Sequence, residues 1–351
     1  MFTWTETPLL QIWHHLRYLQ STSNVASLLS GKITSNREPI FSGSNDIPRR
    51  SHEIASCIRQ ADEYYKAAEN VGLSTHPLLQ FYGATSLAKA VILFNMPSIS
   101  LLDLKYHGLH TRHKKVKDPA LHQSIESYTE NALMWNIEDE FAIMNDGVFP
   151  NLCESIGDVK PEKGVIIKFK EIIRILPDLS GLFRRHYGEP SHCFRTYTLP
   201  PLRKDNSGKF EVIFDSREDK QNILKVFPEL ESDFEEFENN HRTGFRSRKE
   251  LEKFPDFGII EEGTLAGNYL VRPIPCGIHK SFSVIFLGLF ILSTVVRYKP
   301  SFWVQAIAGE NSGSVSIVET FCNLAKRRLP NDALESIWEE KFEYGTPARL
   351  A

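Results

Sequence analysis

The feature that most constrains this chain is an uncharged apolar segment, FSVIFLGLFILSTVV, at residues 282–296. Its 15 residues fall short of the roughly 20 that a helix needs to cross a bilayer, and Ser283, Gly288 and Arg297 lie in or directly after it. A helix that is apolar on every face must be covered by protein. We therefore expect a core helix buried on all sides and no membrane association.

A second segment, PLLQFYGATSLAKAVILF at residues 77–94, is almost as apolar. Pro77 suits the first turn of a helix, where a backbone N–H has no intrahelical partner, and Pro97 marks its end. The simplest cover for each apolar helix is the other one, which predicts that distant parts of the chain form one helical body.

The remaining pattern changes along the chain from helical to mixed and back to helical. Before residue 136, apolar spacing predicts helices at 8–20, 50–71 and 118–133, an irregular connection at 21–49 and a loop at 106–109. The middle of the chain predicts strands at 140–144, 192–199, 210–215 and 269–272, a helix at 168–187 and a solvated acidic helix at 228–240. From 279 to about 343 we expect helix again, broken at Pro300, around 309–313 and at Pro330.

This order predicts a mainly α fold, in which N- and C-terminal segments form a helical body around a mixed α+β insert. The expected parts are an N-terminal helical part at 1–135, the insert at 136–275 and a C-terminal helical part at 276–351. With 351 residues the chain is long enough to bury a core without a metal or disulfide.

Composition narrows the classes of function. The net charge of −3 excludes a basic field over the whole chain, so any nucleic-acid binding must use a local patch. The five cysteines are scattered, with no CxxC pair, which is typical of a reducing cytosol and argues against a zinc site. The chain has no GxxxxGK[ST] loop, GxSxG elbow or HExxH motif. We expect no cofactor and no metal, and a cytoplasmic protein.

Several short pieces, in order and spacing, resemble the YaaC-like family of bacterial proteins. They are Pro77–Gly83 with Ser86–Ala90, His107-Gly108-Leu109, Gly147-Val148-Phe149, Leu176–Leu179, Leu292-Ser293, Arg297–Pro300 and Trp303. The resemblance extends from about residue 55 to the end of the chain. It implies a cytoplasmic, bacterial, helical protein and no established reaction.

The helix at 77–94 also resembles, more weakly, the first long helix of HEPN domains, through Phe81-Tyr82 and Ala88-Lys89-Ala90. That resemblance implies a metal-independent ribonuclease, often in phage defence, with an Arg followed by four to six residues and then a His at a helix start. The nearest match, Arg185 and His192, spans Gly188-Glu189-Pro190, a sequence that should break a helix.

A cluster rich in histidine and basic residues is the main candidate for ligand or phosphate binding. Its members are His107, His110, Arg112, His113, Lys114 and Lys115, and Arg297 is a further candidate. Arginine grips phosphate with two bonds, and a histidine can exchange a proton near neutral pH. The alternatives are a solvated basic loop, and for Arg297 a cap on the last turn of its helix. Basic neighbours and Gly108 disfavour a metal on the three histidines.

Two other basic features have mainly structural interpretations. Lys89 is either a lysine that reaches along the apolar helix to solvent or the partner of a buried carboxylate. The basic stretch at 241–248 is expected to be a charged surface loop.

We therefore expect an interaction or ligand-binding module without classical catalysis. The alternative is a HEPN-like ribonuclease or defence effector, with His107, Arg112, Arg185 and His192 as candidate catalytic residues. A protein partner or a second copy of the chain is expected, and nucleic acid remains open as a partner through the local basic patches.

Overall fold

A computed structural model describes residues 1–35, 46–111, 136–197, 202–205, 207–262, 267–308 and 314–345. The chain divides into two compact units. Residues 1–169 and 281–351 form unit 1, and residues 170–280 form unit 2. The sequence placed the corresponding boundaries at 135/136 and 275/276, so the segment 136–169 belongs with the helical unit in the structure.

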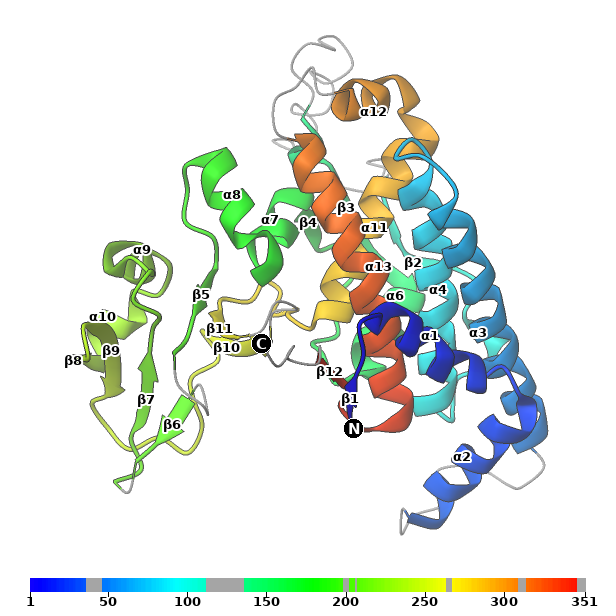
Figure 1. Cartoon of the computed structure of the whole chain (residues 1–351), viewed down its shortest axis with the longest axis horizontal. Helices are drawn as coiled ribbons and strands as arrows, with labels where there is room; N and C mark the ends of the chain where they lie inside the picture. Colours follow the sequence, from blue (N-terminus) through cyan, green and yellow to red (C-terminus); the bar gives the residue numbers. More distant parts are fainter. Residues whose placement is uncertain are drawn as a thin grey trace. The chain divides into compact units, whose positions relative to one another are not determined.

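Unit 1 is built around helix α4 (His76–Asn95), as Figure 1 shows. Helices α3 (Ile47–Glu69), α11 (Ser281–Tyr298), α13 (Ser314–Trp338) and α6 (Val148–Ser155) all pack on it. Three further helices belong to this unit: α1 (Pro8–Tyr18), α2 (Thr22–Ser35) and α12 (Pro300–Ile307). The mainly α fold with a mixed region is confirmed.

The two apolar helices pack on each other as expected. The Phe81 ring of α4 lies 5.5 Å from the Phe286 ring and 5.6 Å from the Phe290 ring of α11, measured between centroids. Both helices are long and apolar enough to cross a membrane, but 78% of each is buried within the fold. They therefore behave as core helices. Gly288 provides the close approach to α13, because a Cβ there would lie 2.3 Å from the Phe321 ring.

Unit 1 also holds two small sheets. An antiparallel sheet joins β2 (His107–His110), β3 (Phe141–Gly147) and β4 (Ile166–Lys168) in that order. The other sheet pairs β1 (Phe2–Trp4) in parallel with β12 (Glu343–Gly345), so the two ends of the described chain lie side by side.

Unit 2 combines short helices with two antiparallel sheets. Its helices are α7 (Phe169–Arg174, which begins at the boundary), α8 (Ser180–Tyr187), α9 (Lys220–Val226) and α10 (Glu229–Asp233). One sheet has the order β10 (Ile259–Glu262), β11 (Asn268–Val271), β5 (Cys193–Arg195). The other has the order β6 (Leu202–Lys204), β7 (Phe210–Ile213), β9 (Arg242–Ser247), β8 (Phe234–Asn239). Phenylalanines such as Phe214, Phe227 and Phe245 fill its core.

Several expected elements are wrong. Residues 22–35 form helix α2 where we expected an irregular connection, and 107–110 form strand β2 where we expected a loop. The single helix expected at 168–187 is divided into α7 and α8 around Pro177. The acidic segment is mostly strand β8, and the basic stretch is strand β9, not a loop. Pro330 lies inside α13 without ending it. The helix expected at 118–133 lies outside the described residues.

Candidate functional site

The candidate site is centred on His107, which begins strand β2. Two glycines set the local path of the chain. Gly108 has a φ of +78° and Gly147 a φ of +143°, both in the region that side chains disfavour. A Cβ on Gly147 would lie 2.4 Å from the carbonyl oxygen of Tyr106, and a Cβ on Gly108 would lie 2.7 Å from Cδ of Pro150. The two matching glycines of the sequence pattern therefore allow β2, β3 and α6 to meet directly at His107.

The imidazole of His107 is half-buried against the core of unit 1. Its ring lies edge-on to the Phe81 ring of α4, with 5.1 Å between centroids. Burial lowers the pKa of His107 below its usual value, and the positive charges of Arg297 and Lys89 lower it further. His107 is therefore neutral near pH 7 and presents one nitrogen that donates and one that accepts a hydrogen bond.

Arg297 lies in the last turn of α11. Its Nε donates to the carbonyl oxygen of Ser293 at 3.1 Å, a carbonyl one turn inside the helix and not one of the free carbonyls that the expected cap would bind. Its guanidinium also lies 5.2 Å from the centre of the Tyr298 ring, a side chain that is 69% exposed. These contacts engage one edge of the guanidinium with the backbone carbonyl of Ser293 and the hydroxyls of Ser293 and Thr294. Among the described residues no carboxylate forms an ion pair with it.

Lys89 extends from α4, whose other faces are almost wholly buried. Its ammonium acts on His107 and on Cys57 of α3, and burial raises the pKa of the Cys57 thiol to about 11. Within the described ranges Lys89 has no carboxylate partner, which favours the interpretation of a lysine that reaches solvent along an apolar helix. The two cations Lys89 of α4 and Arg297 of α11 thus act on one neutral histidine, His107 of β2.

Of the remaining members of the basic cluster, the structure describes only His110. His110 ends β2, paired with Ile143 of β3, and is partly exposed. Arg112, His113, Lys114 and Lys115 lie outside the described residues. The structure thus describes the start of the predicted cluster, where the charges of Lys89 and Arg297 act on His107.

The candidate nuclease pair, Arg185 and His192, lies in unit 2. Arg185 is exposed in the last turn of α8, and Gly188 ends that helix with a φ of +64°. His192 comes after this break and hydrogen-bonds through its backbone to Arg174 and Arg272. Burial, with Arg174 and Arg272 nearby, lowers the pKa of His192 to about 4. The pair therefore does not lie at the start of one helix, the arrangement that the HEPN pattern implies.

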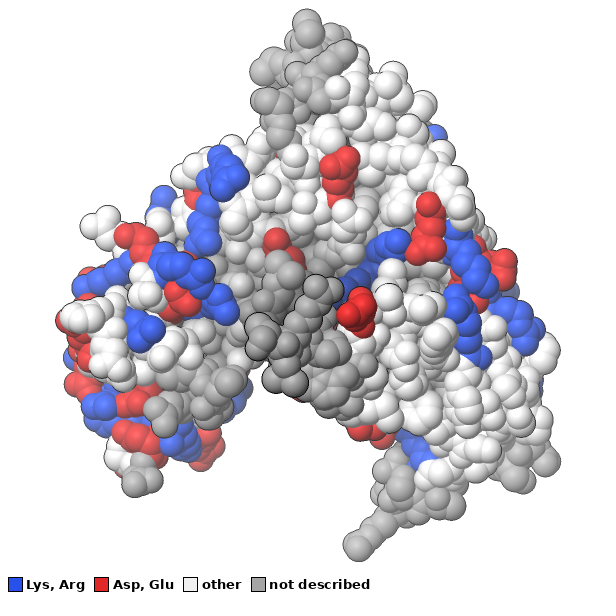
Figure 2. Space-filling model, viewed as in Figure 1, with Lys and Arg blue, Asp and Glu red and all other residues white. Residues whose placement is uncertain are grey.

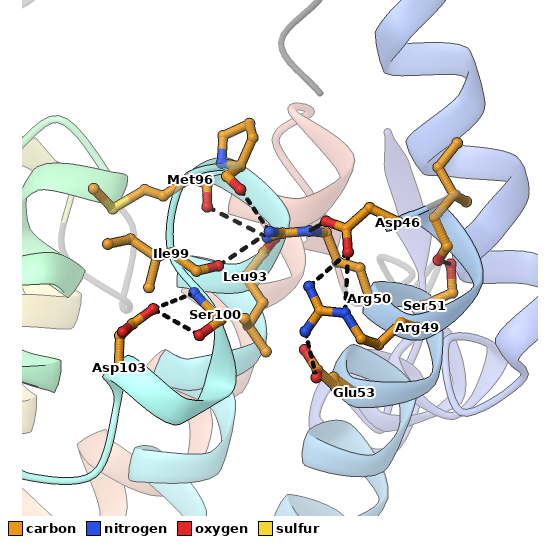
Figure 3. Close-up of polar contacts among 12 residues, drawn as sticks. Asp46, Arg49, Arg50, Ser51, Glu53, Leu93, Met96, Ile99, Ser100 and Asp103 are labelled. Atoms are coloured by element: carbon orange, nitrogen blue, oxygen red, sulfur yellow. Dashed lines mark hydrogen bonds and ion pairs between the residues drawn. The ribbon is translucent and has the colours of Figure 1, made fainter. Parts of the chain in front are cut away.

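Sequence reasoning missed the buried Arg50 of α3, drawn in Figure 3. Its Nη1 donates to the carbonyls of Leu93 at 2.6 Å and Met96 at 3.3 Å, and its Nη2 to those of Pro97 at 2.6 Å and Ile99 at 3.0 Å. These carbonyls lie at the end of α4, where a helix leaves carbonyls without intrahelical partners, and in the segment that leads to β2. The spacing of Arg50 with Ile54 and Cys57, four and seven residues on, was the available signal.

The same segment is fixed again at Ser100. The carboxylate of Asp103 accepts hydrogen bonds from the backbone N–H of Ser100 at 2.8 Å and from its hydroxyl at 2.6 Å (Figure 3). Asp46 binds Arg50 from the other side at 3.4 Å. Arg50 and Asp103 therefore hold the connection between α4 and β2, and with it the start of the strand that carries His107.

Comparison with known proteins gives one result. The family described as YaaC-like Protein matches residues 17–337, nearly the whole chain. No curated protein and no solved structure matches. The match covers every element that forms the His107 site, from α3 through β2 to α11. The chain therefore belongs to the YaaC-like protein family.

Proposed function

We propose that unit 1 is a ligand-binding module that recognises a small oxyanion, such as a phosphate group, at His107, Lys89 and Arg297. The observation that carries this proposal is the local charge. Two cations act on one neutral histidine, and neither has a carboxylate partner in the described part of the chain. Cations held partly out of water without a counter-ion favour binding of an anion.

The three side chains offer complementary chemistry to an oxyanion. Arg297 supplies a planar set of N–H donors, of which its hydrogen bond to Ser293 uses one edge. Lys89 supplies a point charge with three donors, and the neutral imidazole of His107 supplies one directed N–H. None of these contacts requires bond breaking, so the proposal is one of binding without classical catalysis.

The surface charge in unit 2 supports a small ligand more than a polyanion. Figure 2 shows Lys and Arg intermixed with Asp and Glu over the visible face of unit 2, while the visible face of unit 1 has fewer charges. A nucleic-acid surface needs cations that are not cancelled by neighbouring carboxylates. The ribonuclease alternative, the cytoplasmic location and a protein or second-copy partner all stay predictions.

Titration of the purified protein with inorganic phosphate tests the proposed site. We expect saturable binding in calorimetry, with Kd raised about 10-fold or more in Lys89→Met and in Arg297→Gln, since a hydrogen bond to a charged group contributes about 1.5–3 kcal/mol. Lys105→Met is the matched control, because Lys105 is exposed two residues before His107. It should bind phosphate as the parent protein does.

Two results would overturn the proposal. One is the absence of phosphate binding by a folded protein, and the other is equal loss of affinity in Lys105→Met. Incubation with labelled RNA under chelator tests the alternative in parallel. Cleavage that is abolished by His192→Ala and retained by His107→Ala would place a nuclease in unit 2.

A further inference from the structure

We propose that the free edge of strand β8 binds an extended, basic segment of another protein, which adds to the four-stranded sheet of unit 2 as a further strand. The sheet has the order β6, β7, β9, β8, so β8 is one of its two outer strands (Figure 1). Strand addition of this kind uses backbone hydrogen bonds for affinity and side chains for specificity. The inference concerns unit 2 and is independent of the oxyanion site proposed in unit 1.

The hydrogen bonds of the sheet show which backbone groups of β8 are free. In an antiparallel pair, residues that exchange backbone hydrogen bonds alternate with residues that do not. The N–H of Arg248 donates to the carbonyl of Asp233 at 3.0 Å, and the register from this pair makes Glu235 a hydrogen-bonded partner of β9. The backbone N–H and C=O groups of Glu236 and Glu238 therefore point away from β9, along the open edge, where no described residue bonds to them.

The charge of this edge selects the kind of segment that can pair with it. Glu235, Glu236 and Glu238 are all exposed, with Glu236 and Glu238 on one face of the strand and Glu235 on the other. Among the described residues, Lys220 binds Glu236 at 2.6 Å, the exposed His241 lies 3.4 Å from Glu238, and Glu235 has no ion pair. Lysines or arginines two residues apart on an added strand would lie opposite Glu236 and Glu238.

The same glutamates disfavour a second copy of the chain as the added strand. Two β8 strands paired antiparallel about Phe237 would bring Glu236 of each copy opposite Glu238 of the other, and like charges directly opposite each other destabilise a sheet. Proteins also block edges with very short strands, prolines or bulges. Strand β8 has six residues, no proline and an unbroken register with β9, so charge is the device it uses. Negative charge repels another β8 edge and attracts a basic segment.

A fluorescent hexapeptide of alternating lysine and valine is the probe for this edge. At low ionic strength it should bind saturably and slow hydrogen exchange at the backbone amides of Glu236 and Glu238. Glu238→Pro removes one outward N–H and should raise the Kd at least about tenfold, because a proline ring blocks pairing at that position. Glu238→Gln is the matched control, since it removes the same charge but keeps the N–H. It should raise the Kd only about two- to fivefold.

A second peptide tests strand pairing with the unchanged protein, and it decides if Glu238→Pro fails to fold. The same hexapeptide with a methyl group on every amide nitrogen keeps its charge but cannot donate backbone hydrogen bonds, so it should not bind. Equal binding of both peptides would show attraction by charge alone and would overturn the proposal. So would no binding by the folded protein, equal affinity for a peptide of alternating glutamate and valine, or a dimer that Glu238→Pro abolishes, which would make a second copy the occupant.

Discussion

Gly108 and Gly147 determine where the His107 imidazole lies, although neither has a side chain. Both have positive φ, and both are in contact with backbone or ring atoms that leave no room for a Cβ. Backbone strain of this kind persists where the surrounding structure requires it. The glycines of the HGL and DGV stretches are therefore explained by a close crossing of chains, with no direct part in binding a ligand.

Substitution Gly147→Ala should lower the free energy of unfolding by about 2–4 kcal/mol, because the new methyl group would meet the Tyr106 carbonyl. Urea denaturation measures the loss. Gly164→Ala is the control: Gly164 also has a positive φ, +89°, but nothing lies within 4 Å of a Cβ there. It should lose only about 1 kcal/mol. An equal loss in both variants would show that φ alone, and not the crossing, constrains Gly147.

Sequence reasoning reached part of the site at this scale. His107 and Arg297 were identifiable because polar residues stand out beside long apolar helices. The sequence also predicted that Arg297 caps the free carbonyls of its helix, but its side chain binds the Ser293 carbonyl one turn inside the helix. Arg50 was not identified, since its role depends on carbonyls more than 40 residues away. The influence of Lys89 on His107 likewise depends on tertiary contact and has no sequence signal.

At the scale of elements, strongly apolar helices were predictable and ambiguous polar segments were not. The helices α4 and α11 lie close to their expected limits because continuous apolar sequence admits few structures. Strand β8 lies in the acidic segment expected to be a solvated helix, and it carries Phe234 and Phe237, three residues apart. In the strand they lie on opposite faces: Phe234 joins the core, and Phe237 covers Gly244 of β9.

The packing of α11 on α13 gives an element-scale prediction. Gly288→Ala should destabilise the protein by about 1–3 kcal/mol, because the added methyl group would overlap the buried ring of Phe321. Gly181→Ala, in helix α8 of unit 2, is the matched control with open space around its Cβ. It should be neutral or stabilising by up to about 1 kcal/mol, from helix propensity. Thermal unfolding of both variants checks the pair, and a stabilised Gly288→Ala would contradict the close packing.

At the scale of the whole molecule, the two units carry buried titratable groups with opposite pKa shifts. In unit 2, the pKa of His192 is lowered to about 4. In unit 1, burial raises the pKa of Asp332 to about 6, against the opposing effects of Arg328 and of the hydroxyl of Ser281. The Asp332 side chain is only 10% exposed, and it accepts a 2.6 Å hydrogen bond from Ser281.

These shifts predict opposite pH dependence. His192 binds its proton less tightly when folded, so its contribution to stability is present above about pH 6.5 and is lost as the pH falls toward 4. Asp332 binds its proton more tightly when folded, so its contribution is present below about pH 4 and is lost as the pH rises toward 6. Each change is on the order of 3 kcal/mol.

Calorimetric unfolding at intervals from pH 4 to 6.5 measures both effects. We expect His192→Gln to lose less stability than the parent protein as the pH falls. We expect Asp332→Asn to lose less stability than the parent protein as the pH rises. Parallel pH profiles for the parent protein and both variants would show that these groups do not control the stability of their units.

In the sequence, unit 2 lies between the two segments of unit 1, so the ribosome makes all of unit 2 before the second segment of unit 1. Helix α4 emerges after its partner α3, but its partners α11 and α13 follow only after residues 170–280 have been made, so the faces that these two helices cover stay uncovered until then. At about 5–20 residues per second, that interval lasts roughly 6–20 s. Unit 2 is continuous and is completed first. The face of α4 that α11 and α13 will cover therefore stays exposed for several seconds, a period in which a chaperone can bind it.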